Sequence, residues 1–257
     1  MNRLVLRLAV AACASGIAGG TALTTAADAA PTIAHQPRVS QKPINTRSGW
    51  ASSNWSGYAI TGGPFTAVTG SWVVASVAAS RKSTYSSSWV GIDGFNNSNL
   101  IQTGTEQDYY NGQTHYGAWW EILPAAETPI SMTVLPGDVM SARISRNSNG
   151  SWTISISDTT RNESFSIVQS YSGPLTSAEW IQEAPTVGGR VATLAQYSSP
   201  DKFDPGTANG ANPGLTAADG GVMVQRNIQV STPSNPDSDT DGFNMAYGAT
   251  APSPPSS

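Results

Sequence analysis

Residues 176–185 read TSAEWIQEAP, and the alternation of their side chains is typical of a β-strand. One face of this strand would carry Trp180, and the other would carry two carboxylates, Glu179 and Glu183. Two acids beside an indole do not suit a plain hydrophobic core, because charged groups are seldom buried without partners. The stretch therefore predicts a strand that packs through Trp180 and presents a polar, functional face.

Short alternating runs of this kind recur along the chain, separated by Gly, Pro, Asn and Asp, while helical periodicity is almost absent. The runs predict strands near residues 53–60, 65–75, 86–93, 100–109, 115–123, 130–134, 138–147, 151–158, 163–171, 177–183, 190–198, 222–230 and 243–248. Residues 199–214, SPDKFDPGTANGANPG, predict a long loop. So many strands with short connections predict an all-β fold, a sandwich of two large antiparallel sheets of jelly-roll or concanavalin-like type.

The N-terminus has the features of a secretion signal. Arg3 and Arg7 precede a small apolar stretch, and alanines at 27 and 29 suit a cleavage site. We expect a signal peptide over 1–29 and a secreted, extracellular product. The only cysteine, Cys13, lies within this signal, so the exported part has no disulfide and no thiol nucleophile.

Three further segments follow from composition. Residues 30–49 contain three basic side chains and no acid, which indicates a basic linker or a short pro-segment. We expect residues 50–248 to form the β-sandwich domain and residues 249–257 to form a disordered tail. A basic pro-segment would be attracted to an acidic domain at neutral pH and would loosen as the acids protonate; a mere spacer is the alternative.

From residue 50 onward, eight basic side chains face sixteen acidic ones, a formal charge of −8. This balance argues against a nucleic-acid partner. Beyond the signal, no apolar run is long enough to span a bilayer, so we expect no membrane partner. We expect the protein to act on its substrate as a monomer.

Several catalytic machineries can be set aside. With His35 in the 30–49 segment, His115 is the only histidine of the domain, and no nucleophile-elbow motif accompanies it. Zinc would need further His or Cys ligands. The residues 237–242, DSDTDG, match the start of a calcium loop, but Gly248 stands where the twelfth-position Glu belongs, so a solvated turn is the default. We expect no metal and no cofactor in catalysis.

Carboxylates, amides and tryptophans remain as candidate functional groups. Applying the two-residue period to four segments groups acids, an amide, Trp and Gly on one face of each. The groups are Trp89, Gly91 and Asp93; Leu100, Gln102, Gly104 and Glu106; His115, Gly117, Trp119 and Glu121; and Glu179 with Glu183. If these faces align across one sheet, they line a binding cleft with Trp walls and Gly floors. A solvent-exposed outer face is the alternative.

Five stretches carry a family resemblance: SSNWSGYAI at 52–60, SSWVGIDG at 87–94, LIQTG at 100–104, YGAWWEILP at 116–124 and SAEWIQE at 177–183. In this order and near this spacing, they resemble the glutamic peptidase (eqolisin) family of secreted acid endopeptidases. The resemblance covers about residues 50–230. It implies a β-sandwich with a catalytic cleft on its concave face and polypeptides as substrates.

The resemblance also implies site residues. The family's Gln/Glu catalytic dyad falls on Gln102 and Glu179, and Trp55, Trp89 and Asp93 match its motifs. Glu106 stands where the family often has Asp. Together with the cleft-face analysis, this gives a substrate-binding set of Trp55, Trp89, Asp93, Glu106, Trp119 and Glu121.

The residues themselves support such a dyad. A carboxylate can take a proton from water as a general base and return it to the leaving amine. A free Glu titrates near ~4.3, so this base works in acid, where histidine is protonated. The amide of Gln102 can donate to a developing oxyanion. The alternatives are a jelly-roll glycoside hydrolase and a non-catalytic carbohydrate-binding domain, which also use Trp-lined grooves.

Overall fold

Residues 30–42 and 49–257 are described by the computed structural model, and within these ranges every regular element is a β-strand. The predicted signal, residues 1–29, lies outside the described residues. The described residues from Pro31 onward belong to one compact unit. In the part of the chain that the structure describes, no helix could cross a membrane.

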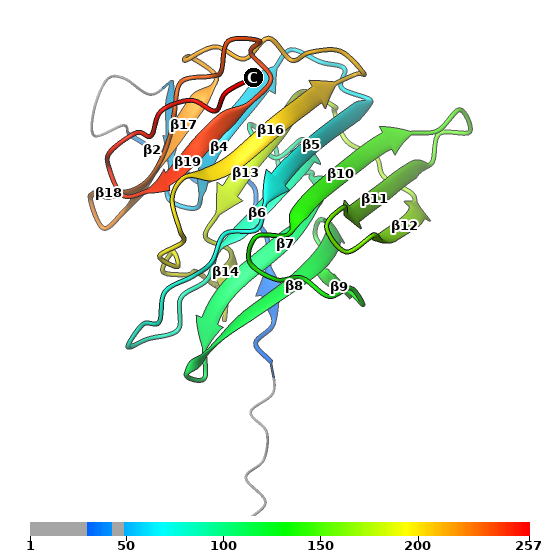
Figure 1. The fold of residues 1–257 in the computed structure, drawn as a ribbon. Coiled ribbons are helices and arrows are strands. Elements are labelled where there is room, and N and C mark those ends of the chain that lie inside the picture. The colour runs from blue at the N-terminus through cyan, green and yellow to red at the C-terminus, as the bar shows by residue number, and fades with distance from the viewer. Residues whose placement is uncertain (1–29, 43–48) are drawn as a thin grey trace, which may run out of the picture. The chain divides into compact units, whose positions relative to one another are not determined.

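The strands form two layers (Figure 1). One contains β5 (Ala67–Val73), β10 (Val139–Arg146), β11 (Trp152–Asp158), β12 (Glu163–Gln169), β16 (Asp201–Ala208) and β19 (Phe243–Tyr247). The other contains β4 (Trp55–Thr61), β6 (Ser87–Ile92), β7 (Ile101–Tyr110), β8 (Gln113–Ile122), β9 (Thr128–Ile130) and β13 (Ser177–Glu183). β5 and β10 contact β6 and β7 without pairing with them, so the layers pack face to face. This confirms the predicted β-sandwich.

Shorter elements join the layers and border the second one. β17 (Gly220–Gln225) and β18 (Ile228–Pro233) run between β4 and β19 in a continuous hydrogen-bonded order. β3 (Trp50–Ser52) pairs in parallel with β17 and antiparallel with β2 (Ser40–Gln41). β1 (Ile33–Ala34), β14 (Thr186–Val187) and β15 (Arg190–Val191) make a separate three-stranded sheet.

The main core fills the space between the layers. Trp180 lies in it at 2% exposure, together with Val90 of β6 and Ile154 and Ile156 of β11. The Trp180 indole Nε1 donates to the carbonyl of Thr69 in the opposite layer, at 2.7 Å. Trp180 therefore anchors β13 from behind, as the sequence predicts.

The predicted long loop over 199–214 is wrong, because residues 201–208 form β16. This strand pairs with β5 on one side and β19 on the other. The residues that suggest a loop, Pro205 and Gly206, lie at a register shift within the strand, between Phe203 and Gly206. Pro has no N–H for the ladder and is tolerated at such irregularities, so tertiary pairing overrides the local signal.

Three other strand predictions need correction. The strand predicted at 130–134 ends at its first residue, because β9 spans Thr128–Ile130. The strand predicted at 222–230 is two strands, split by a turn at Arg226 and Asn227, whose φ angles are 52° and 63°. Only residues 190–191 of the predicted strand 190–198 are a strand, with isolated bridges at Leu194 and Tyr197. The tail 249–257, predicted to be disordered, has no strand but packs back, since the Asn244 amide donates to the carbonyl of Ser253 at 2.9 Å.

Truncating Trp180 tests the anchoring of β13. We expect Trp180→Ala to lower the free energy of unfolding by about 3–5 kcal/mol, because it leaves a large core cavity and an unpaired carbonyl on Thr69. Urea denaturation measures this change. The control is Val168→Ala on β12, where the side chain is 59% exposed and the change should stay within about 0.5 kcal/mol. Equal effects of the two substitutions would contradict the anchoring role.

Candidate active site

The strand register aligns the polar faces of β13, β6, β7 and β8. Glu179 lies opposite Gly91, Gly91 opposite Gln102, and Gln102 opposite Glu121. These four residues form one row across the sheet, on the face that points away from the main core. The alignment that the sequence left as a hypothesis is therefore confirmed.

Two parallel rows complete this site face. The middle row is Ile181, Trp89, Gly104 and Trp119, and the third is Glu183, Ser87, Glu106 and Gly117. Glycine is required at position 104, because a Cβ there would come within 2.4 Å of the Cβ of Trp89. The glycine floor lets the tryptophan rings lie close to the sheet.

Tryptophans make a second apolar cluster on this face, separate from the main core. Trp55, Trp89 and Trp119 are all buried within it, and the rings of Trp55 and Trp89 meet edge to face at 4.9 Å. Trp89 Nε1 donates to a Glu183 carboxylate oxygen at 2.8 Å, and Trp119 Nε1 donates to the Ser87 hydroxyl at 3.1 Å. The predicted cleft tryptophans are thus brought together, and two of them position polar groups.

Gln102 and Glu179 stand on either side of Gly91. Adjacent strands are about 4.8 Å apart, so the two Cα atoms are separated by about 10 Å. Gln102 Nε2 donates to Glu121 at 2.6 Å, while Gln102 Oε1 and both carboxylate oxygens of Glu179 have no hydrogen-bond partner among the described residues. Burial, and to a lesser extent the charge of Asp93, raise the pKa of Glu179 well above its usual value, while the nearby Ser177 hydroxyl opposes the shift.

Asp93 lies at the end of β6 and organises loops. Its carboxylate accepts hydrogen bonds from the backbone N–H groups of Leu175 and Thr176 and from the Tyr171 hydroxyl, at 3.0, 2.9 and 2.7 Å. Its own φ of 74° is rare for a residue with a side chain, and these bonds hold it there. Its contacts are those of a loop anchor, so a contact with substrate stays a prediction.

The carboxyl groups of Glu106 and Glu121 both have raised pKa values. Burial, with the nearby Glu127 carboxylate, raises the pKa of Glu106 to about 8. Burial also raises the pKa of Glu121 to about 7, with Glu183 adding to the effect and His35 opposing it. Both acids therefore keep their protons well above the range of a free glutamate.

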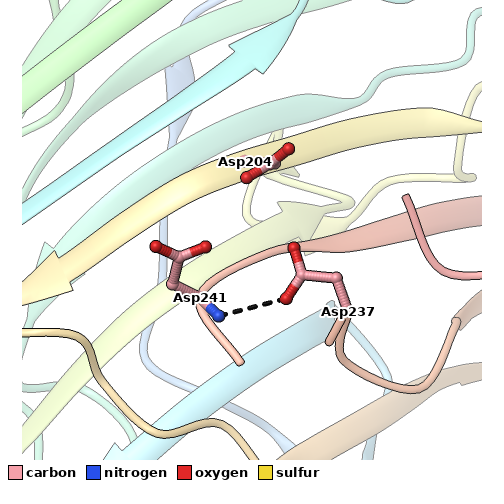
Figure 2. Close-up of side chains that lie close together, drawn as sticks. All are labelled: Asp204, Asp237 and Asp241. Carbon is pink, nitrogen blue, oxygen red and sulfur yellow. Dashed lines mark hydrogen bonds between the residues drawn. The ribbon is translucent and has the colours of Figure 1, made fainter. Parts of the chain in front are cut away.

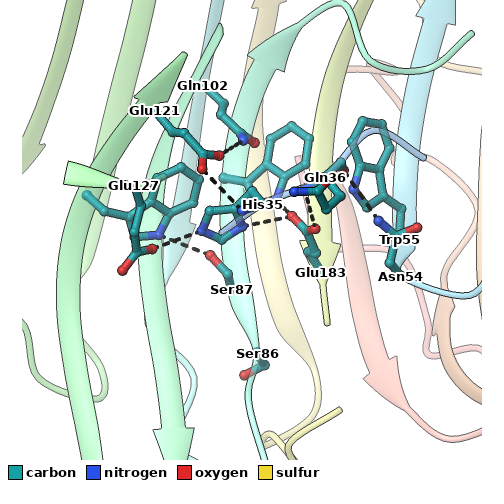
Figure 3. A network of polar contacts seen from close by, with 12 residues as sticks. His35, Gln36, Asn54, Trp55, Ser86, Ser87, Gln102, Glu121, Glu127 and Glu183 are labelled. Carbon is teal, nitrogen blue, oxygen red and sulfur yellow. Dashed lines mark hydrogen bonds and ion pairs between the residues drawn. The ribbon is translucent and has the colours of Figure 1, made fainter. Parts of the chain in front are cut away.

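Sequence reasoning placed His35 in a linker, but its ring lies on the site face (Figure 3). The imidazole stacks on Trp119 at 3.7 Å and is fully buried. Its Nδ1 lies 2.9 Å from Glu183 Oε2, and its Nε2 lies 3.1 Å from Glu127 Oε2. The only sequence signal for this placement is the short apolar run before it, in which Ile33 is also buried.

Residues 31–42, which we call the strap, cross the site face. Beyond His35, the backbone N–H of Gln36 donates to Glu183, and the Asn54 amide donates to the carbonyls of Gln36 and Pro37. The guanidinium of Arg38 lies 4.0 Å from the ring centre of Phe95. Strand pairing fixes both ends, β1 to β14 and β2 to β3. The segment predicted as a linker thus packs on the domain.

The charge of His35 follows from its neighbours. Complete burial lowers the pKa of His35, but the carboxylates of Glu183, Glu127 and Glu121 outweigh this and hold it well above its usual value. The ion pairs with Glu183 and Glu127 therefore favour the imidazolium form of His35. Among the described residues of the strap it makes the only ion pairs with the domain.

These features define an all-β protein whose polar rows lie on one sheet face, and comparison with known proteins identifies its class. The Peptidase A4 family model matches residues 53–244, most of the chain. The chain belongs to this family, which confirms the resemblance to the glutamic peptidases and favours a peptidase over the carbohydrate-active alternatives.

Particular relatives agree. Aspergillopepsin-2 of Aspergillus niger is 31% identical over 175 residues, which cover 58% of this chain and 61% of that protein, so the match spans less than two thirds of the relative. The structure of scytalido-glutamic peptidase with a transition state analog inhibitor gives a TM-score of 0.66 at 25% identity, over 76% of this chain and 98% of that one. Aspergilloglutamic peptidase from Aspergillus niger gives 0.54 at 26%, over 64% and 99%.

The raised pKa of Glu106 predicts a pH-dependent stability. A carboxyl whose pKa rises on folding stabilises the fold fully below its unfolded value, and this contribution is lost as pH rises through the folded value, here about 8. Glu106→Gln mimics the protonated group at every pH. We expect it to match the parent protein near pH 5 and to be the more stable of the two near pH 9, measured by urea denaturation.

Glu163 is a partly exposed residue of β12, and Glu163→Gln is the control. Its stability in urea should equal that of the parent protein at both pH values. A Glu106→Gln protein that loses as much stability between pH 5 and pH 9 as the parent does would contradict the assignment.

Proposed function

We propose that this protein is a secreted acid endopeptidase that hydrolyses peptide bonds with Gln102 and Glu179 as its catalytic dyad. The observation that carries this proposal is the row of Glu179, Gly91 and Gln102. It sets a carboxyl and an amide with unused hydrogen-bonding capacity on either side of a residue without a side chain. Membership of the Peptidase A4 family supports it.

In the proposed reaction, the ionised Glu179 takes a proton from a water molecule, whose oxygen attacks the scissile carbonyl carbon. The carbonyl oxygen becomes an oxyanion, which the Gln102 amide stabilises. The protonated Glu179 then gives its proton to the leaving nitrogen, and the C–N bond breaks. No metal or cofactor takes part in these steps.

Glu121 would orient the amide of Gln102. An amide NH₂ has two donor hydrogens, and Gln102 uses one of them on Glu121 at 2.6 Å. The second hydrogen is available for the oxyanion. Glu121 is thus a positioning residue in this proposal.

The raised pKa of Glu179 applies to the protein before substrate enters the site. A carboxyl that keeps its proton cannot act as a general base. Because burial is the main cause of the raised pKa, admission of water and substrate would lower it and allow the carboxyl to ionise. We propose that this rehydration precedes catalysis in acid.

The dyad is tested by two substitutions. Glu179→Gln should abolish turnover of denatured casein at about pH 3.5, because an amide cannot accept the proton. Gln102→Ala should lower turnover by at least ~10²-fold, as expected for the loss of one oxyanion donor. Circular dichroism shows whether each variant folds, and Glu163→Gln is the control that should keep full activity.

Retention of more than about a tenth of the parent rate in a folded variant would reject that residue's role. A chelator should leave turnover at about pH 3.5 unchanged. Inhibition by the chelator, or a higher rate at pH 7 than at pH 3.5, would reject the carboxylate mechanism as a whole.

We also propose that the domain acts outside the cell and that residues 30–49 are an inhibitory pro-segment. Export is supported by the signal-like sequence of residues 1–29. Inhibition is supported by the strap, which lies on the site face and binds Glu121 through the backbone N–H of His35 at 3.3 Å. A substrate that approaches Gln102 along this face would have to displace it.

The direction of the pKa shift of His35 bears on how the strap leaves. With the strap bound, the carboxylates of Glu183, Glu127 and Glu121 raise the pKa of His35. This raised pKa adds stability to the strap-bound form as pH falls, and that stability is fully present below the free value of 6.5. The sign for His35 opposes the expectation that acid alone loosens the segment. We therefore propose that cutting, not dissociation, removes it.

Self-processing is tested with a precursor that starts at Ala30, moved from pH 7 to about pH 4. The active precursor should shorten to a start near residue 48, while its Glu179→Gln counterpart stays intact. Adding His35→Gln to the active precursor removes the ion pairs to Glu183 and Glu127, so processing should become several-fold faster. Gel electrophoresis and N-terminal sequencing follow the products.

Gln41→Ala is the matched control, since this side chain is exposed on the same segment. It should leave the processing rate unchanged. Equal trimming of the Glu179→Gln precursor, or no trimming of either form, would reject an autocatalytic pro-segment.

A further inference from the structure

None of the residues in the rows of the candidate active site belongs to a cluster of three aspartates, which Figure 2 shows. Asp204 comes from β16, and Asp237 and Asp241 come from the loop between β18 and β19. One carboxylate oxygen from each lies within 4.8 Å of the others. Two segments more than thirty residues apart in sequence therefore direct three acids at one point.

The hydrogen bonds of the cluster leave oxygens unused on its inner side. Asp237 Oδ1 accepts the backbone N–H groups of Asp241 and Gly242, both at 3.2 Å, while Asp237 Oδ2 has no partner among the described residues. Asp237 is only 6% exposed, so water does not readily compensate for this. Asp241 Oδ1 is likewise buried and without a partner in the described structure.

The site is shaped around these oxygens. A Cβ on Gly242 would come within 2.5 Å of Asp237 Oδ2 and 2.8 Å of the Cβ of Asp204. Only glycine at this position allows the two carboxylates to approach each other. The turn that the sequence marks as the start of a calcium loop is thus closed by an acid from another strand.

The charges of the cluster do not balance. Lys202 Nζ lies 3.0 Å from Asp204 Oδ2 and is the only cation that pairs with the cluster in the described part of the chain. Three carboxylates beside one ammonium need either shared protons or a further cation.

We propose that Asp204, Asp237 and Asp241 form a Ca²⁺ site. Calcium takes six to eight oxygen ligands in flexible geometry and binds with a Kd of about 10⁻⁴–10⁻³ M in extracellular modules, which suits a site of three carboxylates completed by backbone carbonyls and water. The ligands must be ionised, so the ion binds at neutral pH and leaves in acid.

The ion would stabilise the sandwich rather than act in catalysis. The carbonyl of Asp241 accepts the N–H of Gly206 in β16 at 2.8 Å, and a Cβ on Gly206 would come within 2.6 Å of Trp180 Nε1. The site therefore adjoins the inward anchor of β13, the strand that carries Glu179 on its other face. An ion here would tie the β18–β19 loop to β16 behind that strand.

Thermal unfolding at pH 7 tests the site with Ca²⁺ itself as the probe. In about 10 mM CaCl₂, we expect the Tm to rise by about 3 °C over the value in EDTA, since a ligand that binds only the folded state stabilises it by mass action. Isothermal titration calorimetry should give one ion per chain. At about pH 4 the rise should vanish.

Asp237→Asn and Asp241→Asn should each abolish the rise in Tm, and using both guards against a variant that fails to fold. Asp239→Asn is the matched control, because it removes the same charge from the same loop without a ligand atom in the cluster. It should keep the rise. No rise in the parent, or an equal rise in both cluster variants, would overturn the proposal. Shared protons, and not a cation, would then offset the charges of the three carboxylates.

Discussion

The register between β13, β6, β7 and β8 is the constraint on which the rest of the structure depends. Side chains alternate along a strand, so a shift by one residue in any of these pairings would carry its functional groups into the core. Trp180 fixes the register of β13 from the core side through its bond to Thr69. The register then sets Glu179, Gln102 and Glu121 in a single row.

The second general feature is the number of acids held away from water on one face. Glu121, Glu179 and Glu183 are all fully buried, which is costly for an ionised carboxylate without a partner. Two features offset this cost: raised pKa values favour the uncharged forms of Glu121 and Glu179, and Glu183 receives donors from Trp89 and His35. The titration behaviour of the site therefore depends on what covers it.

Much of this arrangement could be predicted from the sequence, because alternation in SAEWIQE, LIQTG and YGAWWEILP fixes which residues share a face. The strand β16 could not be predicted from the sequence, because Pro205 and Gly206 signal a loop. Only pairing with β5 and β19 makes the segment a strand. The position of His35 could not be predicted either, because its partners, such as Glu183, lie far along the chain and no local pattern links them. The Asp237 turn was visible, but Asp204 joins it only through the fold.

The covalent attachment of the strap gives it an advantage that its contacts alone do not. While residues 31–42 remain joined to β3 through the chain, they meet the site at the effective concentration of a short tether, of millimolar order. A single cut between them would make the same contacts intermolecular, and a peptide of this length at low concentration would diffuse away. One hydrolysed bond would thus convert a reversible equilibrium into a one-way step without altering any contact that holds the strap.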